Sequence, residues 1–264
     1  MCERQPAAAP EVIAPLAKDC IKAGIENAYW NNQQLRENHY EPSRAITEYL
    51  FTVSVAMELL KVRRLKAAND ILIHVEYAAS AFVNNAFERF RLNAHQRRQS
   101  HRPLRTGRID IAILQLAPLL SMRSLIGIEL KGVNPPLGKV DADLRRLAHA
   151  MHQVDPIGAS SLSVSFGAFV KDLKRKNELF NRNEMRPRMR TLEQNLTDRF
   201  NTVIRRYGGI RAVVEVWSVN AKGADEVAEE IPEEHHERAD IIRETRADAG
   251  ALIILERTDG ARGA

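Results

Sequence analysis

The sequence predicts an α/β fold, in which strands and helices are mixed along one chain. Several short segments alternate apolar with other residues or are rich in Ile and Val, which is typical of strands. Between them lie longer segments whose apolar residues recur three or four positions apart, which is typical of helices. With 264 residues, 44% of them hydrophobic and 28% charged, the chain is long and apolar enough to form a substantial core.

The composition excludes several classes of protein. No apolar run reaches the roughly 18–20 residues that are needed to cross a bilayer. The first residues, MCERQPAAAPEV, lack the apolar core of a signal peptide, so a cytoplasmic setting is expected. Only Cys2 and Cys20 are present, so at most one disulfide can form, and a C-x-x-C metal site is absent.

Two helices are expected before the first strand. Residues 10–36 have helical spacing, and we interpret residues 1–40 as an N-terminal helical extension that packs on a main domain of residues 41–264. Pro42 and Ser43 then favour a helix start. The apolar residues that recur at helical spacing after this start are Ile46, Leu50, Val53, Met57 and Leu60.

The next elements alternate between strands and helices. DILIHVEY (70–77) predicts a strand, AASAFVNNAFERF a short helix, and RIDIAIL and LIGIELKG two further strands. KVDADLRRLAHAMHQ predicts a helix, SLSVSFGAFV a strand, and MRTLEQNLTDRFNTVIRRY a helix. IRAVVEVWSV and GALIILER complete the set of strands, and the acidic segment between them, 225–240, is expected to be an exposed insertion.

The charge is unevenly distributed along the chain. The net charge is +5, but residues 89–108 contain seven arginines, two histidines and no acid, whereas residues 225–240 contain eight acids and one arginine. A basic block of this kind indicates either a surface that faces phosphates or a solvated loop.

Three charged residues lie on the two central predicted strands. Successive side chains of a strand point to opposite faces, so Asp110 lies opposite the face of Ile109 and Ile111, and Glu129 and Lys131 share one face. If the two strands pair with their isoleucine faces together, the three charged side chains project from a common side. The connection of about ten residues does not fix the register, so the sequence permits Asp110 to lie level with Glu129 but does not require it.

GRIDIAIL followed by IGIELKG resembles the PD-(D/E)XK nuclease superfamily, which has the restriction-endonuclease-like fold. Asp110 matches the first motif position, although Ile109 replaces the proline of the name, and Glu129-Leu130-Lys131 matches E-x-K. The resemblance covers roughly residues 43–170 and implies a mixed β-sheet flanked by helices. In this family a helix before the sheet often contributes a further acid, for which Glu48 is the natural candidate and Glu76 a rival.

The resemblance implies metal-dependent hydrolysis of phosphodiester bonds, most readily in DNA, in bacterial defence or a mobile element. Mg²⁺ or Mn²⁺ is the expected cofactor, with Asp110, Glu129 and the Leu130 carbonyl as ligands. Neighbouring carboxylates raise the pKa of a lysine, so Lys131 is expected to stay charged and to orient the nucleophile. The residues expected to contact nucleic-acid phosphates are Arg97, Arg98, Arg102, Arg105, Arg108 and Lys139.

Two other functions remain open at this point. A nuclease-like fold can bind nucleic acid without cutting it, which would retain the basic surface but show no metal-dependent activity. The chain can also be a member of a larger complex, with the acidic segment as a docking tail. Many enzymes of the family pair up to cut two strands, so a homodimer is a further partner state that the resemblance allows.

Overall fold

The computed structural model describes residues 10–37, 44–62, 70–86, 107–117, 121–152, 154–155, 158–160, 162–230 and 244–258. Its helices are α1 (Pro10–Glu37), α2 (Arg44–Lys61), α4 (Ala79–Asn84), α6 (Leu137–His152), η3 (Arg182–Glu184), α7 (Met185–Ile204) and α8 (Ala224–Glu230). Its strands are β1 (Ile71–Ala78), β2 (Arg108–Ala117), β3 (Ser121–Val133), β4 (Val154–Asp155), β5 (Gly158–Ala159), β6 (Val164–Asp172), β7 (Ile210–Lys222) and β8 (Arg246–Arg257).

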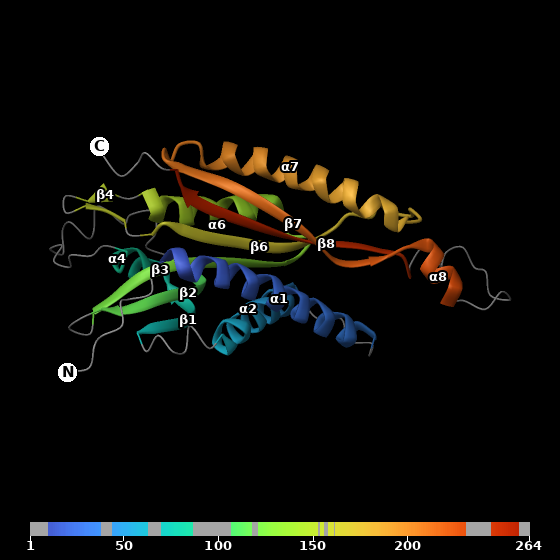
Figure 1. Ribbon diagram of the computed structural model, residues 1–264, viewed down its shortest axis with the longest axis horizontal. Helices are drawn as coiled ribbons and strands as arrows, with labels where there is room; N and C mark the ends of the chain where they lie inside the picture. The colour runs from blue at the N-terminus through green and yellow to red at the C-terminus, as the bar shows by residue number, and fades with distance from the viewer. Residues whose placement is uncertain are drawn as a thin grey trace.

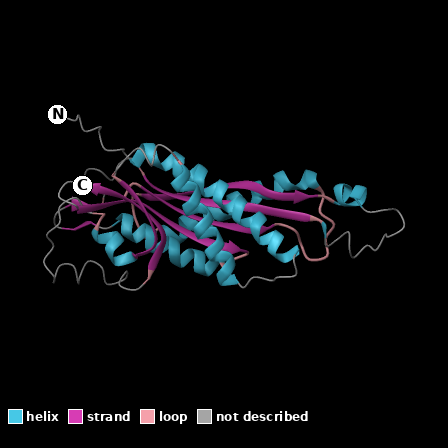
Figure 2. Cartoon of the chain, turned by 90° about the horizontal axis from the view of Figure 1, so that it is seen from below, coloured by secondary structure: helices cyan, strands magenta, loops and turns pink. Residues whose placement is uncertain are grey.

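One mixed sheet of six strands forms the centre of the molecule, in the order β1-β2-β3-β6-β8-β7. Strands β3 and β6 run parallel, because α6 crosses over between them, and the other neighbours are antiparallel. Helices α6 and α7 cover one face of the sheet, and α1 and α2 lie on the other (Figure 1). Figure 2 shows that the helices lie along the length of the strands. The expected mixed α/β sheet flanked by helices is therefore confirmed.

The α1/α2 face is built from apolar side chains that point out of alternate positions of the strands. Ile111, Ile126 and Ile128 pack there against Phe51 of α2 and Ile25 of α1. The two helices approach closely, because a Cβ atom at Gly24 would lie 2.5 Å from the Val55 Cα atom. Helix α1 thus shares one core with α2 and the sheet.

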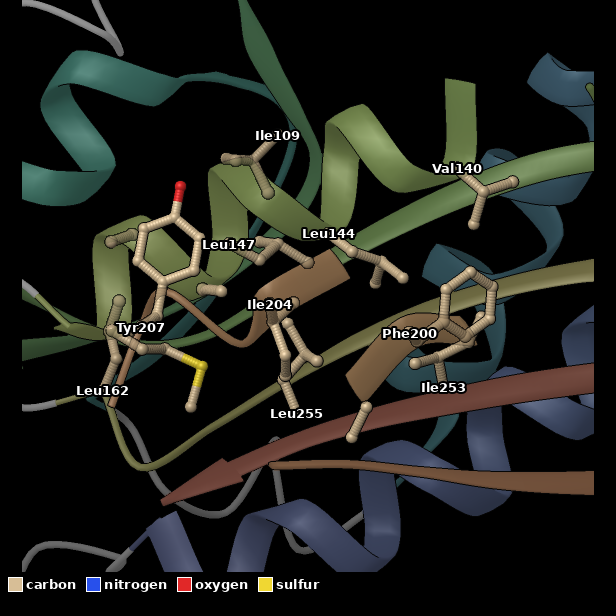
Figure 3. Packing of buried hydrophobic residues seen from close by; sticks show 14 of the residues in the cluster. Ile109, Val140, Leu144, Leu147, Leu162, Phe200, Ile204, Tyr207, Ile253 and Leu255 are labelled. Carbon is tan, nitrogen blue, oxygen red and sulfur yellow. The ribbon is translucent and has the colours of Figure 1, made fainter. Parts of the chain in front are cut away.

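The opposite face has its own apolar core beneath α6 and α7. Leu144 and Leu147 of α6 meet Phe200 and Ile204 of α7 over Ile253 and other residues of the sheet (Figure 3). Helix α7 also covers the outer edge of β7. The Asn201 side chain donates to the Ala212 carbonyl at 2.9 Å and accepts from the Ala212 N–H at 3.0 Å. An edge strand is thereby closed at this point to pairing with another chain.

The predicted helices and long strands are found among the described residues, where the short helix expected over 78–90 is α4 and residues 87–90 lie outside the described part, but three details differ. On α2, Met57 and Leu60 are half exposed, because Phe51, Val55 and Leu59 face the core. Ile109 packs in the α6/α7 core and not with Ile111, at the point where Glu76 on the neighbouring strand has a left-handed backbone with φ of 56°. The first part of the acidic segment forms α8, whose Glu226 is ion-paired with Arg182.

Candidate functional site

Acidic residues from three neighbouring strands lie at one level of the sheet. Strands β2 and β3 pair Ile111 with Ile128, so one further step of this register sets Asp110 opposite Glu129. Strands β1 and β2 pair Val75 with Ile111 and Tyr77 with Ile109, which brackets Glu76 opposite Asp110. The sequence does not fix how these two strands pair. In the structure they pair in the register that brings Asp110 and Glu129 together.

Asp110 is held by the backbone of the next strand. Its Oδ2 atom accepts a hydrogen bond from the Leu130 N–H at 2.6 Å. A carboxylate that takes a main-chain donor is fixed in direction, since the donor belongs to a rigid strand. The Leu130 carbonyl, the other backbone group expected at the site, accepts a hydrogen bond from the Lys131 Nζ atom at 3.2 Å.

Glu129 and Lys131 point toward α6, where two charged residues meet them. The Arg146 guanidinium donates to Glu129 Oε1 through Nε at 3.1 Å and Nη2 at 2.6 Å. Asp143 lies 3.0 Å from Lys131 Nζ and accepts from Arg146 at 2.8 Å. We call Asp110, Glu129, Lys131, Asp143 and Arg146 the charged cluster; it joins β2, β3 and α6 into one network.

Burial raises the pKa of both strand carboxyls. For Glu129, which is 2% exposed, burial is the main cause and the nearby charge of Asp110 adds to it, while Arg146 opposes the shift. For Asp110, burial again comes first, and the Leu130 N–H and Lys131 act against it. Burial disfavours the charged form of Lys131, but Asp143 and Asp110 outweigh it and raise the pKa of the ammonium group. Lys131 is therefore positively charged at neutral pH.

The charged cluster contains more negative than positive groups. Three carboxylates face two cations, and Glu76 adds to the negative potential at Asp110. Glu129 Oε2 is buried and makes no hydrogen bond to any residue that the structure describes. A buried oxygen of this kind is costly unless something binds it, and a proton or a cation can do so.

These donors fit a magnesium ion that keeps most of its water ligands. Among the described residues, no group of three or more His, Cys, Asp and Glu side chains is arranged to hold a metal ion. Asp143 is ion-paired with both Lys131 and Arg146, which leaves Asp110 and Glu129 as the candidate ligands. Mg²⁺ is commonly bound through only one or two carboxylates, with several waters retained. The unpartnered Glu129 oxygen beside a second carboxylate is the observation that suits such an ion.

The two candidates for the additional acid lie on different sides of the sheet. Glu48 lies on α2, and a Cβ atom at Gly132 would be 3.5 Å from the Glu48 Cγ atom, on the face that α2 covers. Glu129 and Lys131 point to the α6 face. Glu76 lies opposite Asp110 and contributes to its raised pKa. The structure therefore brings Glu76, and not Glu48, to the charged cluster.

Of the six basic residues expected to contact nucleic acid, the structure describes Arg108 and Lys139. Arg97, Arg98, Arg102 and Arg105 lie outside the described residues. Arg108 is exposed at the start of β2, where its Nη1 atom lies 3.5 Å from the Glu76 carbonyl oxygen. Lys139 is exposed in the first turn of α6, on the helix that carries Asp143 and Arg146.

Asp143 and Arg146 are the members of the charged cluster that the sequence analysis missed. They lie three residues apart in the helix that follows E-x-K, beside its apolar stripe of Val140, Leu144 and Leu147. A charged pair at this spacing resembles an ordinary exposed helix pair. Gly107, with φ of 124°, allows the close approach of Arg146, because a Cβ atom there would lie 3.2 Å from Nη1.

Comparisons with known proteins place the chain in no family: no family model, no curated protein and no solved structure matches it. Within the described residues, none of the helices has the length and apolar character of a membrane span.

Proposed function

We propose that the protein is a magnesium- or manganese-dependent nuclease that hydrolyses phosphodiester bonds, with DNA as the first substrate to test. The observation that carries this proposal is the position of Asp110 and Glu129 at one level of neighbouring strands, with Lys131 beside them. The order α2, β1, α4, β2, β3, α6 also supports a restriction-endonuclease-like arrangement, because the E-x-K strand is followed directly by a helix. A cytoplasmic setting and a homodimeric state belong to the same proposal.

Each residue of the charged cluster has a distinct task in this chemistry. Asp110 and Glu129 would hold the ion, which supplies a more acidic bound water and neutralises charge on the phosphate. Lys131, which stays protonated beside Asp143, orients the attacking water and stabilises the negative charge that develops on the phosphate oxygens. Arg146 neutralises one oxygen of Glu129 and leaves the other oxygen free to bind the ion.

A plasmid-nicking assay with Mg²⁺, Mn²⁺ or EDTA tests the activity. We expect Lys131→Ala to abolish cleavage and to keep most of the affinity for Mn²⁺ in calorimetry, because the lysine is no ligand. Asp110→Ala should lose that affinity. Lys61→Ala is the matched control, since Lys61 lies on α2 and pairs with Glu58 at 2.6 Å. A Lys131→Ala protein that cuts at the wild-type rate would refute the assignment.

The two acidic candidates can be separated in the same assay. Glu76→Ala should slow cleavage more than Glu48→Ala, because only Glu76 lies opposite Asp110 on the sheet. The reverse order would mean that the additional acid acts through the α2 face.

A nucleic-acid-binding module without cleavage is the second candidate function. The contact that favours it is the double hydrogen bond from Arg146 to Glu129, which gives this carboxylate a stable partner in the absence of a metal ion. In this case wild-type protein would bind DNA in a gel-shift assay, with the steep salt dependence of phosphate contacts, but would not nick it with any metal.

A further inference from the structure

A basic hollow lies between α6 and the C-terminal end of α7, outside the charged cluster. It has a volume of about 510 Å³. Its lining residues are Arg145, Thr202, Val203, Arg205 and Arg206. Three of these five side chains are arginines and none is acidic. We call this site the arginine hollow.

Helices α6 and α7, which form the walls of the arginine hollow, are held at a fixed distance from each other. Arg199 of α7 donates to both carboxylate oxygens of Asp141 on α6, at 3.1 and 2.6 Å. Beneath them, Leu147 and Ile204 belong to the core in which the two helices pack (Figure 3). Because Arg199 takes both oxygens of Asp141, this acid is already engaged and does not neutralise Arg145, which follows one turn later.

The three arginines carry charge that the described structure does not neutralise. The side chains of Arg145 and Arg205 are exposed and make no hydrogen bond or ion pair with any described residue. Arg206 donates to the Tyr207 hydroxyl at 2.6 Å and stacks 4.8 Å from the centre of its ring, which fixes the direction of its guanidinium group. Guanidinium groups that line one hollow without an acid are suited to the charge of a phosphate.

We infer that the arginine hollow binds a phosphate group of a nucleic-acid strand. A free nucleotide suits it less well, because sites for small ligands are mostly apolar, and Val203 is the single apolar side chain in this lining. A strand needs only its backbone phosphate held here, while its sugars and bases stay in solvent.

The position of the arginine hollow also indicates a path for the strand. Arg145 and Arg146 are neighbours on α6, so their side chains diverge by about 100°, an arc of about 10 Å on a helix roughly 10–12 Å across. Arg146 reaches the charged cluster on one flank of α6, and Arg145 lines the hollow on the other. A strand that crosses the exposed side of α6 would contact both. This path rests on the proposed nuclease function, whereas phosphate binding in the hollow does not.

Binding of a labelled single-stranded DNA, measured by fluorescence anisotropy in EDTA, tests the site without cleavage. The variant is Arg145→Gln/Arg205→Gln/Arg206→Gln. The control, Lys176→Gln/Arg186→Gln/Arg190→Gln, removes the same charge from exposed residues at the other end of α7 and the turn before it.

We expect the Kd of the hollow variant to rise at least about tenfold, and its salt dependence to become shallower by about 0.7 per lost contact. Arg145→Gln/Arg205→Gln keeps the contact of Arg206 with Tyr207 and should show most of this effect even if the triple variant is poorly folded.

Several outcomes would overturn the inference. One is an equal loss of DNA binding in the hollow variant and the control; another is no loss in either. A third is that the hollow variant keeps its DNA affinity but loses binding to phosphatidylserine vesicles or to a free nucleotide, which would assign the arginines to another phosphate source. Loss of DNA binding in the hollow variant, combined with a wild-type protein that never nicks DNA, supports the hollow and refutes the nuclease proposal. Nicking by the hollow variant with an unchanged Kd for DNA refutes only the hollow.

Discussion

The two faces of the central sheet each bury an acid, but in different surroundings. On the α1/α2 face, Asp248 is 7% exposed and accepts a hydrogen bond from the Tyr29 hydroxyl at 2.6 Å. Asn220 donates in turn to the Tyr29 oxygen at 3.3 Å. On the α6/α7 face, Glu129 is 2% exposed and lies among charged groups: Arg146 on one oxygen and Asp110 on the neighbouring strand.

This comparison shows that a buried acid with a raised pKa does not by itself define a site. Burial is the main cause of the raised pKa in both Asp248 and Glu129. At Asp248, the hydroxyl of Tyr29 on α1 gives the carboxyl a structural partner between helix and sheet, and the nearby charges of Asp172 and Arg246 act on its pKa in opposite directions. Glu129 has an unpartnered oxygen, and a second carboxylate and a protonated lysine lie beside it. The two carboxylates can bind a cation, and the lysine can stabilise negative charge on a phosphate.

The largest effect that this comparison predicts is on cleavage. Glu129→Gln should lower the rate of metal-dependent nicking by roughly 10²–10⁴, the range typical for loss of a positioned catalytic group. Asp248→Asn should leave the rate unchanged, because Asp248 faces α1 and not the charged cluster. Initial rates of plasmid nicking at saturating Mn²⁺ compare the two variants directly. An equal loss in both would mean that the assay reports stability and not chemistry.

The two faces should contribute similarly to stability, in contrast to their effects on cleavage. Phe51→Ala on the α1/α2 face and Phe200→Ala on the α6/α7 face each remove a fully buried ring. Each should lower the free energy of unfolding by about 3–5 kcal/mol, as is typical of such substitutions. Guanidinium unfolding followed by circular dichroism should show one transition in both variants. A Phe51→Ala protein of wild-type stability would instead make α1 and α2 a loosely attached layer.

A smaller effect is expected for the hydrogen bond that anchors α1. Tyr29→Phe leaves Asp248 without its hydroxyl donor, which should cost about 1–3 kcal/mol of unfolding free energy at pH 7. The donor favours the ionised carboxylate, so its loss raises the already elevated pKa of Asp248 further. An acid with a raised pKa in the folded state destabilises the fold as pH rises through that pKa, and the cost disappears below the unfolded value. The difference between Tyr29→Phe and wild type should therefore shrink when unfolding is repeated near pH 4.

Local patterns in the sequence were sufficient to predict the elements but not all of their surroundings. The alternation of RIDIAIL and the helical spacing of Leu196, Phe200 and Ile204 depend on neighbours along the chain, and the structure confirms both elements. The outward direction of Met57 could not be predicted, because α2 has apolar residues on two sides and only packing against α1 selects one of them.

The candidate site, too, could be predicted from the sequence only in part. Asp110, Glu129 and Lys131 carry a motif that is visible in the sequence, whereas their register depends on pairing between strands. Arg146 joins them through a contact 17 residues away in the chain. The Arg145–Arg205 juxtaposition in the arginine hollow depends on how α6 packs against α7, for which no spacing in the sequence provides a signal.

The last prediction concerns Cys20, whose reactivity reports whether the α1 layer opens independently of the rest of the sheet. Burial, followed by the charges of Glu58 and Asp19, raises the pKa of its thiol from 9.0 to about 11. Only the thiolate reacts, so at pH 8 a shift of this size lowers the reactive fraction by about 100-fold, and the 6% exposure of Cys20 slows the reaction further. In a Cys2→Ser background, a disulfide reagent such as DTNB should therefore label native protein at least about 100-fold more slowly than the guanidinium-unfolded chain.

Phe200→Ala, on the other face, should leave the labelling rate of Cys20 unchanged if α1 opens alone, and should accelerate it if Cys20 becomes accessible only when the whole sheet unfolds. Rapid labelling of the native Cys2→Ser protein would contradict the close packing of α1 on α2 and would separate the stability of the two faces.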